Sequence, residues 1–476
     1  MTPVPERPTR AKNIDEESFL TDTVYDMVVL GAGSGGYAAA LRGAQLGLRV
    51  ALIEADKVGG TCLHRGCVPT KALLHAAETA DAVRGARALG VDAELRGVDM
   101  AALNAYKDSV VTRMHKGLQG LVASRGIDLI AGRGRLAGAD AVEVDGRAVR
   151  GRNIVLATGS YSKTLGQRID ERVLTSEGAL RLERVPASAV VLGGGVIGVE
   201  FASAWASLGA RVTIVEALPR LVPGEDEAVS KQLERAFRKR RIAVRTNTMF
   251  ESVERHDGGV TVHTQDGKTH DAEVMLIAVG RGPVTADLGY EQAGVAMDRG
   301  FVTTDGFGRT SVPGVWAVGD IVPGVQLAHR GFAQGIVVAE KISGLDPAPV
   351  DDALVPRVTF CEPEIASVGL TEARARQVHG ADAVTTAEFN VAGNAKSQIL
   401  GAQGFVKLVS LKDGPIVGFH AIGARMGEQV GEGQLIVNWE ADADDVAALV
   451  HAHPTQNETL GEAAMALAGK PLHNHG

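Results

Sequence analysis

The chain has 476 residues, of which 45% are hydrophobic, and it carries a formal net charge of −8. That length predicts about three domains with a sizeable buried core. The acidic balance argues against a general nucleic-acid-binding surface, and no apolar run in the sequence is long enough to cross a bilayer, so we expect neither a nucleic-acid nor a membrane partner.

Glycine is frequent, with 59 residues, whereas aromatic residues make up only 4%. Many tight turns and close backbone approaches fit an α/β nucleotide-binding fold better than a β-sandwich. Only three cysteines are present, too few for a disulfide-dense secreted scaffold.

Residues 1–24 contain three prolines and several acidic residues. They lack the apolar stretch of a secretory signal, and their acidic residues fit poorly with an organelle transit peptide. We therefore expect a mobile N-terminal arm on a soluble protein of a reducing compartment, the cytoplasm.

The segment 28–55 recurs without a gap at 190–217, and half of the aligned positions are identical. Each copy reads as an apolar strand, a G-x-G-x-x-G turn, an alanine-rich helix, a second strand and a terminal glutamate. This order is typical of the βαβ unit that binds a dinucleotide. Two complete copies predict two dinucleotide sites.

In the first copy, Gly31 permits the sharp turn from strand to helix, and Gly33 lets the backbone approach a pyrophosphate at the helix N-terminus. Gly36 lets the helix pack closely on the strand. Glu54 lies 18 residues past Gly36, near the separation expected for a carboxylate that accepts hydrogen bonds from ribose hydroxyls.

In the second copy the same roles fall to Gly193, Gly195 and Gly198, with Glu216 as the ribose carboxylate. A carboxylate at Glu216 would repel a 2′-phosphate, so the second site is predicted to bind NAD and not NADP.

Two cysteines, Cys62 and Cys67, follow the first copy directly, in G-G-T-C-L-H-R-G-C-V-P-T-K (59–71). A disulfide beside a nucleotide site indicates redox chemistry, and as a structural staple it would close a very short loop, where chain entropy gives least stabilisation. In a reducing compartment such a bond is more often catalytic than structural. The alternative is a pair of buried thiols that never meet.

Residues 68–80 predict a helix with proline near its first turn. A Cys67 thiolate at its start would gain from the helix dipole and from Lys71 one turn further on. The alternative for Lys71 is an ordinary solvated helix lysine.

Further strands are predicted at 153–160 and 274–283, each ending in a glycine turn, and at 310–320, which ends in Asp320. Residues 351–476 carry no glycine fingerprint. They alternate apolar strands (404–409 and 415–422) with an amphipathic helix (427–440), which predicts an α+β domain.

The segment H-A-H-P-T-Q-N-E (451–458) offers a base for thiol–disulfide exchange, which requires a thiolate attacker. His453 could act as the base that deprotonates a thiol, with a carboxylate such as Glu458 orienting its imidazole ring. Pro454 suggests a turn that brings Glu458 back to this imidazole. His451 is interpreted as structural, and Cys361 as an inert buried thiol.

Taken together, these motifs resemble those of the flavoprotein pyridine nucleotide-disulfide oxidoreductase family, most closely its dihydrolipoamide dehydrogenase branch. The resemblance covers nearly all of residues 25–470. Its most specific pieces are G-G-T-C-L-H-R-G-C-V-P-T-K (59–71), G-G-G-V-I-G-V-E (193–200), W-A-V-G-D (316–320), S-V-G-L-T-E (367–372) and H-A-H-P-T-Q-N-E (451–458).

The resemblance implies two Rossmann-like nucleotide-binding domains, the first for FAD and the second for NAD, followed by a C-terminal α+β dimerisation domain. Residues 25–155 and 281–350 would bind FAD, residues 156–280 NAD, and residues 351–476 would form a homodimer interface. It also implies that Asp320 hydrogen-bonds the ribityl chain of the flavin. The other cofactor contacts it implies are Thr61, Lys71, Gly132, Gly159, Glu200, Gly280 and Ala328.

The same resemblance, and not the spacing, assigns Cys67 as the flavin-facing sulfur and Cys62 as the sulfur that exchanges with substrate. It places His453 and Glu458 opposite the cystine of the other subunit. It implies oxidation of protein-bound dihydrolipoamide with NAD⁺, on lipoyl domains of a 2-oxoacid dehydrogenase or glycine-cleavage complex. No metal ligand set is expected.

Two rival functions remain open from the sequence. Another disulfide reductase, of the glutathione or mycothione type, is the first, although Glu216 argues against the NADP that glutathione-type enzymes use. A docking subunit of a 2-oxoacid dehydrogenase assembly is the second, although it would need neither cystine nor base. Three departures from the family pattern stand out, namely His64 in place of the common asparagine, a short stretch at 161–170 and the extra residues 1–24.

Overall fold

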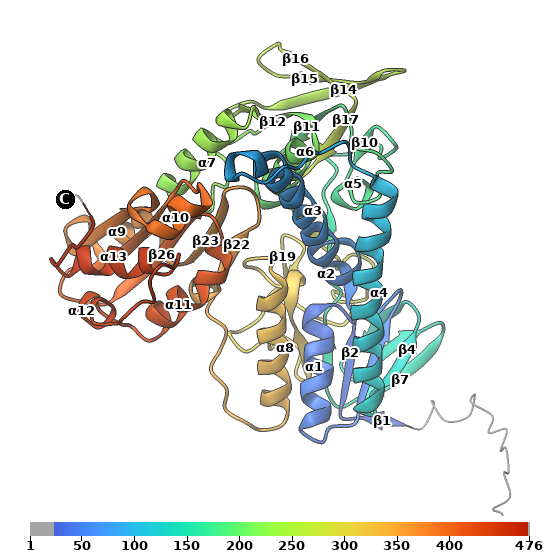
Figure 1. Ribbon diagram of the computed structural model, residues 1–476. Coiled ribbons are helices and arrows are strands. Elements are labelled where there is room, and N and C mark those ends of the chain that lie inside the picture. The colour runs from blue at the N-terminus through green and yellow to red at the C-terminus, as the bar shows by residue number, and fades with distance from the viewer. Residues whose placement is uncertain (1–22, 475–476) are drawn as a thin grey trace, which may run out of the picture.

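The computed structural model describes residues 23–474 (Figure 1). The arm predicted over 1–24 lies outside the described residues except for Thr23 and Val24, and Val24 begins strand β1 (Val24–Tyr25). Within the described range, every helix is too short or too polar to span a bilayer.

A five-stranded parallel sheet forms the first unit, in the order β21-β8-β2-β3-β4. Its central strands are buried on both faces, as is usual for parallel sheets covered on both sides. The strands span Val315–Ala317, Ile154–Leu156, Met27–Leu30, Val50–Glu54 and Asp128–Ala131, respectively.

Three long helices cover one face of this sheet, and α1 and α8 lie side by side (Figure 1). They touch at glycines, because a Cβ on Gly335 would lie 2.3 Å from the carbonyl oxygen of Gly35. A four-stranded sheet, β1-β7-β6-β5, covers the other face. The bounds are α1 Ser34–Gln45, α4 Met100–Ser124, α8 Ala328–Ile342, β5 Gly134–Gly138, β6 Ala141–Val144 and β7 Arg147–Gly151.

The second unit repeats this plan, with a parallel sheet in the order β10-β17-β11-β12-β13. The repeat extends to the register: Val28 faces Ala51 in the first sheet, and Val190 faces Thr213 in the second, 162 residues later in both strands. The bounds are β10 Val173–Leu174, β11 Ser188–Leu192, β12 Arg211–Val215, β13 Ala243–Arg245 and β17 Val274–Ile277.

Helices α6 and α7 pack on one face of the second sheet, and a three-stranded antiparallel sheet, β14-β15-β16, packs on the other. Short helix α5 precedes β11. The bounds are α5 Ser176–Ala179, α6 Val196–Leu208, α7 Glu227–Lys239, β14 Phe250–His256, β15 Gly259–Thr264 and β16 Thr269–Ala272.

The chain leaves the first sheet after β8, builds the second unit, and returns to add β21 and α8. The outgoing strand β9 (Ser160–Ser162) pairs with the returning strand β18 (Arg281–Pro283), so the two crossings between the units lie together. A small hairpin, β19 (Met297–Asp298) with β20 (Phe301–Val302), follows the return.

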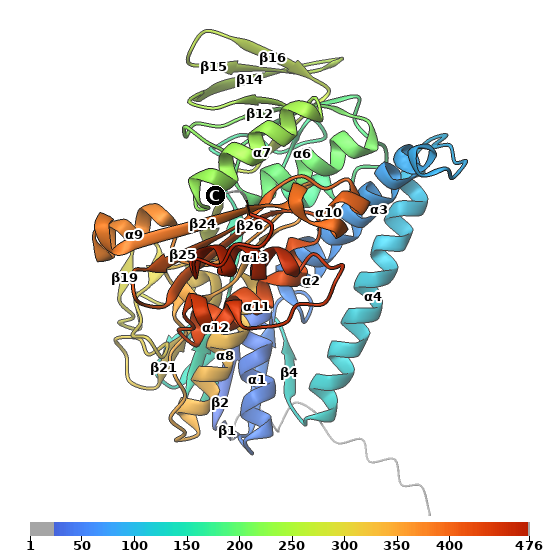
Figure 2. The same ribbon diagram turned by 60° about the vertical axis from the view of Figure 1, so that its left-hand side comes forward.

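A third unit contains an antiparallel sheet in the order β22-β23-β26-β25-β24, with α11 and α13 packed on one face (Figure 2). The predicted α+β domain is therefore confirmed. The bounds are β22 Arg357–Thr359, β23 Glu364–Gly369, β24 Val384–Asn390, β25 Phe405–Leu411, β26 Ile416–Gly423, α9 Glu372–His379, α10 Ala395–Leu400, α11 Met426–Asn438, α12 Ala443–Ala447 and α13 Glu458–Leu467.

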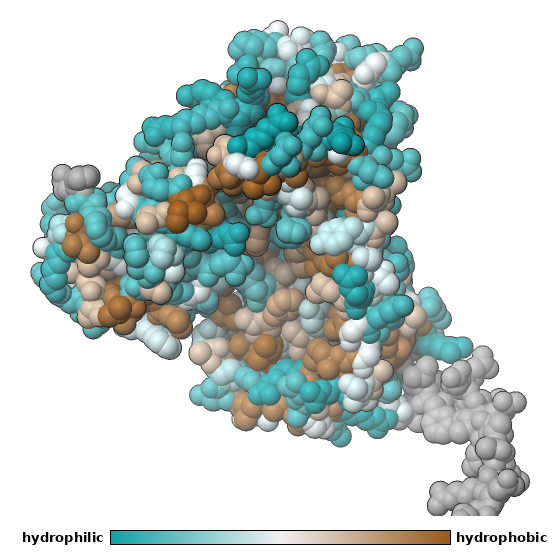
Figure 3. Space-filling view, viewed as in Figure 1, coloured by the Kyte–Doolittle hydropathy of each residue, from teal (hydrophilic) through white to brown (hydrophobic). Residues whose placement is uncertain are grey.

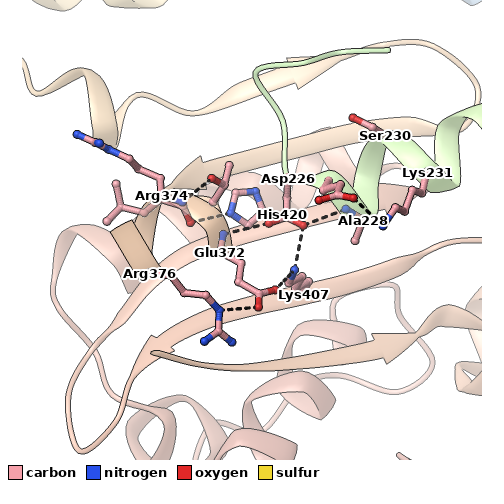
Figure 4. A network of polar contacts seen from close by, with 12 residues as sticks. Asp226, Ala228, Ser230, Lys231, Glu372, Arg374, Arg376, Lys407 and His420 are labelled. Atoms are coloured by element: carbon pink, nitrogen blue, oxygen red, sulfur yellow. Dashed lines mark hydrogen bonds and ion pairs between the residues drawn. The ribbon is translucent and has the colours of Figure 1, made fainter. Parts of the chain in front are cut away.

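A buried polar network joins the second and third units (Figure 4). Lys407 of β25, only 7% exposed, donates hydrogen bonds to Asp226 at 2.9 Å and to Glu372 at 2.7 Å. Asp226 also accepts a hydrogen bond from the backbone N–H of Ala228, and through this bond it caps the N-terminus of α7. Its carboxylate accepts a further hydrogen bond from the backbone N–H of Glu372. This network fixes the start of α7 against the third sheet.

Candidate active site

The carboxyl edge of the first sheet gathers five of the predicted cofactor residues. All five strands run parallel, and one predicted cofactor residue lies at the end of each strand or up to three residues beyond it. These residues are Gly31 (β2), Glu54 (β3), Gly132 (β4), Gly159 (β8) and Asp320 (β21). Ligands of open parallel sheets bind at this edge. The structure thus brings together residues that the sequence separates by nearly 300 positions.

The second sheet shows the same arrangement. Gly193 follows β11, Glu216 follows β12 and Gly280 follows β17 by three residues, and these three strands are neighbours. The second dinucleotide site therefore also lies at the carboxyl ends of parallel strands.

Two glycines of each fingerprint are required by packing, as predicted. Gly31 has φ +101°, and a Cβ on Gly36 would lie 1.8 Å from the carbonyl oxygen of Gly31. In the second copy a Cβ on Gly198 would lie 1.9 Å from the carbonyl oxygen of Gly193. No side chain fits at either crossing of helix and turn.

The middle glycines behave differently, because they face open space. A Cβ on Gly33 or Gly195 would meet no atom within 4 Å. Helices α1 and α6 begin at these glycines, and no side chain caps either helix. Their first N–H groups are therefore available to an anion, so both turns fit a pyrophosphate.

The glutamates that end the two βαβ repeats, Glu54 and Glu216, accept hydrogen bonds from the glycine turns of their own repeats. Glu54 accepts hydrogen bonds from the backbone N–H groups of Ala32 at 2.7 Å and Asp56 at 2.9 Å. Glu216, which is buried, accepts from those of Gly194 and Leu218. Each carboxylate is thus positioned at the edge of its cradle by the backbone.

Asp320 lies in a 3₁₀ turn (Gly319–Ile321) and accepts a hydrogen bond from the hydroxyl of Ser160. Arg281 reaches the same serine from β18, donating to its hydroxyl at 2.7 Å and to its carbonyl at 2.6 Å. The sequence analysis missed Arg281 and Ser160. Each is the direct neighbour of a predicted glycine turn, Arg281 of Gly280 and Ser160 of Gly159, and these positions could have indicated them from the sequence.

Three predicted cofactor contacts, Ala328 and Gly132 at the first site and Gly280 at the second, lie at local backbone features. Ala328 is the first residue of α8, which has no side-chain cap. Gly132 has φ +150° and Gly280 has φ +101°, and both values favour glycine.

Cys62 and Cys67 form a disulfide with a Cα–Cα distance of 4.6 Å. Cys62 lies with Thr61 on the short helix α2 (Gly60–Arg65), and Cys67 is the first residue of α3 (Cys67–Gly85). A Cβ on Gly60 would lie 2.7 Å from the Cα of Gly33, so the cystine segment starts directly against the first pyrophosphate turn. Both sulfurs belong to partly exposed residues. The alternative of two thiols that never meet is wrong.

Lys71 is not a solvated lysine. Its Nζ donates to both carboxylate oxygens of Glu200, at 2.9 and 3.0 Å, and lies 4.6 Å from the centre of the Phe360 ring. Glu200 is only 3% exposed and also accepts from the backbone N–H of Phe360. One ion pair thus connects the cystine helix α3, the second unit and the start of the third.

His453 and Glu458 form the predicted pair, with 2.8 Å between Nδ1 and Oε1. Glu458 also accepts the backbone N–H of Thr455. Burial acts to raise the pKa of Glu458, but these hydrogen bonds outweigh it and hold that pKa below its usual value. A carboxylate that stays ionised keeps the Nδ1 proton on its own side and leaves Nε2 of His453 to act as a base.

A second histidine–glutamate pair, His451 with Glu432, supports the loop that carries His453, and this pair was not predicted. Nε2 of His451 lies 2.9 Å from Glu432 of α11, and the other oxygen of Glu432 accepts from the side chain of Asn457. The hydrogen bond to Glu432 raises the pKa of His451. The prediction that His451 is structural fits this position.

His64, the departure beside the cystine, has two contacts. Its Nε2 lies 2.9 Å from the carbonyl oxygen of Val58, and its ring meets that of His115 on α4 edge to face, with 4.8 Å between centroids. Burial lowers the pKa of His115, and His64 and Lys57 lower it further. Sequence reasoning gave no signal for His115, which is 51 positions from His64.

Within one chain the base and the cystine are separated. Figure 1 shows α13, which begins at Glu458, well apart from α2, which carries Cys62. The His453 side chain is 70% exposed. Figure 3 shows that the face between the third unit and helices α1 and α8 is hollowed and exposes apolar residues. A site that contains both groups therefore needs a second chain.

Comparison with known proteins gives one consistent family. The pyridine nucleotide-disulphide oxidoreductase family matches residues 25–335, and the dimerisation domain of the same family matches residues 355–464. The chain is similar to a dihydrolipoyl dehydrogenase of Bacillus subtilis (39% identity, 94% of this chain and 97% of the relative) and to that of Geobacillus stearothermophilus (38%, 94% and 97%).

Solved structures agree with this result. The crystal structure of LpdA from Mycobacterium tuberculosis superposes with a TM-score of 0.87 at 27% identity, over 93% of this chain and 99% of that one. A Cu(II) complex of the HOCl-induced flavoprotein disulfide reductase RclA from Escherichia coli superposes with a TM-score of 0.84 at 27% identity, over 94% and 100%.

Proposed function

Because the chain belongs to the pyridine nucleotide-disulphide oxidoreductase family, we propose that it oxidises protein-bound dihydrolipoamide to lipoamide with NAD⁺ as acceptor. One observation carries the proposal: helix α2, which carries Cys62 of the Cys62–Cys67 disulfide, starts at Gly60 directly against the pyrophosphate turn of the first dinucleotide cradle. A redox-active cystine placed there can exchange electrons with a cofactor in that cradle.

The residues of the first cradle fit FAD, and those of the second fit NAD. The open turns at Gly33 and Gly195 would receive the pyrophosphates, and Glu54 and Glu216 would accept hydrogen bonds from ribose hydroxyls. The buried carboxylate of Glu216 disfavours a 2′-phosphate, which supports NAD over NADP. Bound FAD supplies an acceptor for the two electrons of the dithiol and a hydride donor for NAD⁺.

In the proposed first half-reaction, His453 takes a proton from one thiol of dihydrolipoamide. The resulting thiolate attacks Sγ of Cys62, which breaks the Cys62–Cys67 bond and leaves Cys67 as a thiolate. The second substrate sulfur then attacks the substrate sulfur of the mixed disulfide, which closes the lipoyl disulfide and releases the Cys62 sulfur, and the proton of the second thiol passes to that sulfur. The substrate thus gives up two electrons and two protons: one proton is on His453, the other is on the Cys62 thiol, and Cys67 remains a thiolate.

Cys67 is suited to hold the negative charge, because it is the first residue of α3 and meets the positive end of the helix dipole. Cys62, on α2, takes the exchanging role. Lys71, fixed by Glu200, supplies a positive charge one turn further along α3.

The dimerisation domain supports a homodimer in which His453 of the partner subunit serves the cystine of this chain. We assign residues 25–155 and 281–350 to FAD, 156–280 to NAD and 351–476 to the dimer interface. The physiological partners are lipoyl domains of a 2-oxoacid dehydrogenase or glycine-cleavage complex, in a reducing compartment such as the cytoplasm.

Steady-state assays test this proposal. The purified flavoprotein is given dihydrolipoamide with NAD⁺ or NADP⁺ and, in the reverse direction, NADH or NADPH with lipoamide, glutathione disulfide or mycothione disulfide. We expect turnover of dihydrolipoamide with NAD⁺ alone. Faster reduction of glutathione or mycothione disulfide would replace this substrate assignment, and a colourless protein without activity would remove the enzyme altogether.

A further inference from the structure

Two segments around the cystine contain no acidic residue. Residues 57–77 and 109–127 lack Asp and Glu entirely, in a chain that has 57 acidic residues and a net charge of −8. The same two segments carry six basic residues, namely Lys57, Arg65, Lys71, Arg113, Lys116 and Arg125. The local charge around the cystine is thus opposite to that of the whole chain.

The fold brings the two segments together. Helix α4 packs against α2 and α3, and the closest aromatic contact between them is that of His115 with His64, two residues after Cys62. Arg113 and Lys116 flank His115 on α4 and are exposed. Lys57, which precedes α2, is also exposed and lies close enough to His115 to help lower its pKa, while the neighbouring Asp56, which is paired with Arg65, acts in the opposite direction.

Several of these cations are not used by the fold. Lys71 is paired with Glu200 and Arg65 with Asp56, which lies just before the acid-free segment. Over residues 23–474, by contrast, no carboxylate forms an ion pair with Lys57, Arg113 or Lys116. Arg113 donates only to the hydroxyl of Ser109. Unpaired like charges on one surface repel one another, so this surface gains when an anionic partner covers it.

Exposed apolar side chains lie on α4 beside the basic ones, about a quarter turn from Arg113 and on the side away from Lys116. On the same helix Met114 is 51% exposed and Leu121 is 41% exposed. A basic rim with exposed methionine and leucine is suited to a folded protein surface. A free dihydrolipoyl amide carries no charge and would gain nothing from such a rim.

We propose that Lys57, Arg113 and Lys116 form a docking surface for an acidic carrier domain that presents the dithiol on a side-chain tether. This inference rests on the proposed function and specifies its partner. The surface holds the carrier by long-range attraction while the tethered dithiol reaches Cys62, so it affects capture of the carrier and not the exchange step.

The test compares two forms of the same substrate. A lipoyl domain of known negative net charge, reduced to its dihydrolipoyl form, and free dihydrolipoamide are each titrated against the wild-type dimer and against the Arg113→Glu/Lys116→Glu variant, at low and at high NaCl. The matched control is Arg235→Glu/Arg238→Glu, which reverses two exposed charges on α7 of the second unit.

We expect the double reversal to raise KM for the carrier domain about tenfold at low salt, and salt to remove most of that difference. The values of kcat and KM for free dihydrolipoamide should stay unchanged, and the α7 control should match the wild type with both substrates. FAD content and dimer mass verify that each variant is folded.

An unchanged KM for the carrier domain in the α4 variant would overturn the docking surface, and so would an equal change with free dihydrolipoamide. An equal loss in the α7 control would show a general charge effect and would also overturn it. Failure of the proposed function is a separate result, because wild-type enzyme would then produce no NADH from free dihydrolipoamide.

Discussion

Replacing Lys407 by methionine should loosen the junction between the second and third units. Methionine keeps much of the length of the side chain but removes the cation that Asp226 and Glu372 share (Figure 4). His420 is fully buried nearby, and burial lowers its pKa, which disfavours a replacement charge at that position.

The expected loss of stability follows from the burial of the Lys407–Asp226 ion pair. Removing one partner of a buried ion pair costs about 3–5 kcal/mol, because the other charge is left uncompensated. Asp226 keeps the backbone N–H groups of Ala228 and Glu372, at 3.1 and 3.0 Å, and Glu372 is partly exposed. We therefore expect a loss near the lower limit, about 3 kcal/mol.

The loss should depend on pH. Burial raises the pKa of Asp226, but the hydrogen bonds and charges around it, with that of Lys407 foremost, together outweigh burial and lower this pKa, and the same lysine lowers the pKa of Glu372. Carboxyl groups with a lowered folded-state pKa add stability above their unfolded pKa, and that stability is lost as the pH falls through the folded value. In the variant both pKa values rise, so less stability remains to be lost on acidification, and the difference between wild type and variant shrinks as the pH falls.

Native-state hydrogen exchange is the appropriate assay, because three units need not unfold together. Amides of β25 and of the first turn of α7 should exchange roughly a hundredfold faster at neutral pH. The control is Lys412→Met, at an exposed lysine beyond the end of β25. Adding Asp226→Asn and Glu372→Gln to Lys407→Met should restore much of the protection. Exchange rates equal to those of the control would refute the reasoning.

Three further predictions concern the nucleotide and redox sites. Gly198→Ala should raise the Kd for NADH more than tenfold in calorimetry while FAD content is retained, because its Cβ would lie 1.9 Å from the Gly193 carbonyl oxygen; an unchanged Kd would contradict this role. Glu458→Gln should lower kcat for dihydrolipoamide about 10²–10⁴-fold and leave electron transfer from NADH to ferricyanide intact, and an equal loss of both would show a general defect. His64→Asn should raise the pKa of His115 in an NMR titration, since His64 contributes to lowering it, and a constant pKa would show that burial and Lys57 are responsible without His64.

Local sequence patterns were sufficient for the nucleotide cradles. The roles of Gly36 and Gly198 depend on atoms a few residues away, so a motif predicts them. The common register of the two sheets agrees with the ungapped repeat but was not itself predicted. The pair His453–Glu458 could be predicted in the same way, because its two members are only five residues apart along the chain.

Contacts between distant segments could not be predicted in this way. Lys407 stands in an apolar strand, and nothing near it in sequence indicates that Asp226, 181 positions earlier, receives its charge. His64 was noticed only as a departure, because its partner His115 comes from another helix. Arg281 and Ser160 meet only because the chain crosses twice between the units at β9 and β18.

The central claim is that the Cys62–Cys67 disulfide is the group through which electrons pass between the dithiol substrate and NAD. Anaerobic reduction of the holoenzyme with one equivalent of NADH per protomer, followed by alkylation and peptide mass spectrometry, tests it most directly. The account predicts new label on Cys62 and Cys67 and none on Cys361, which is 2% exposed. A reduced enzyme in which Cys62 and Cys67 remain joined would contradict it.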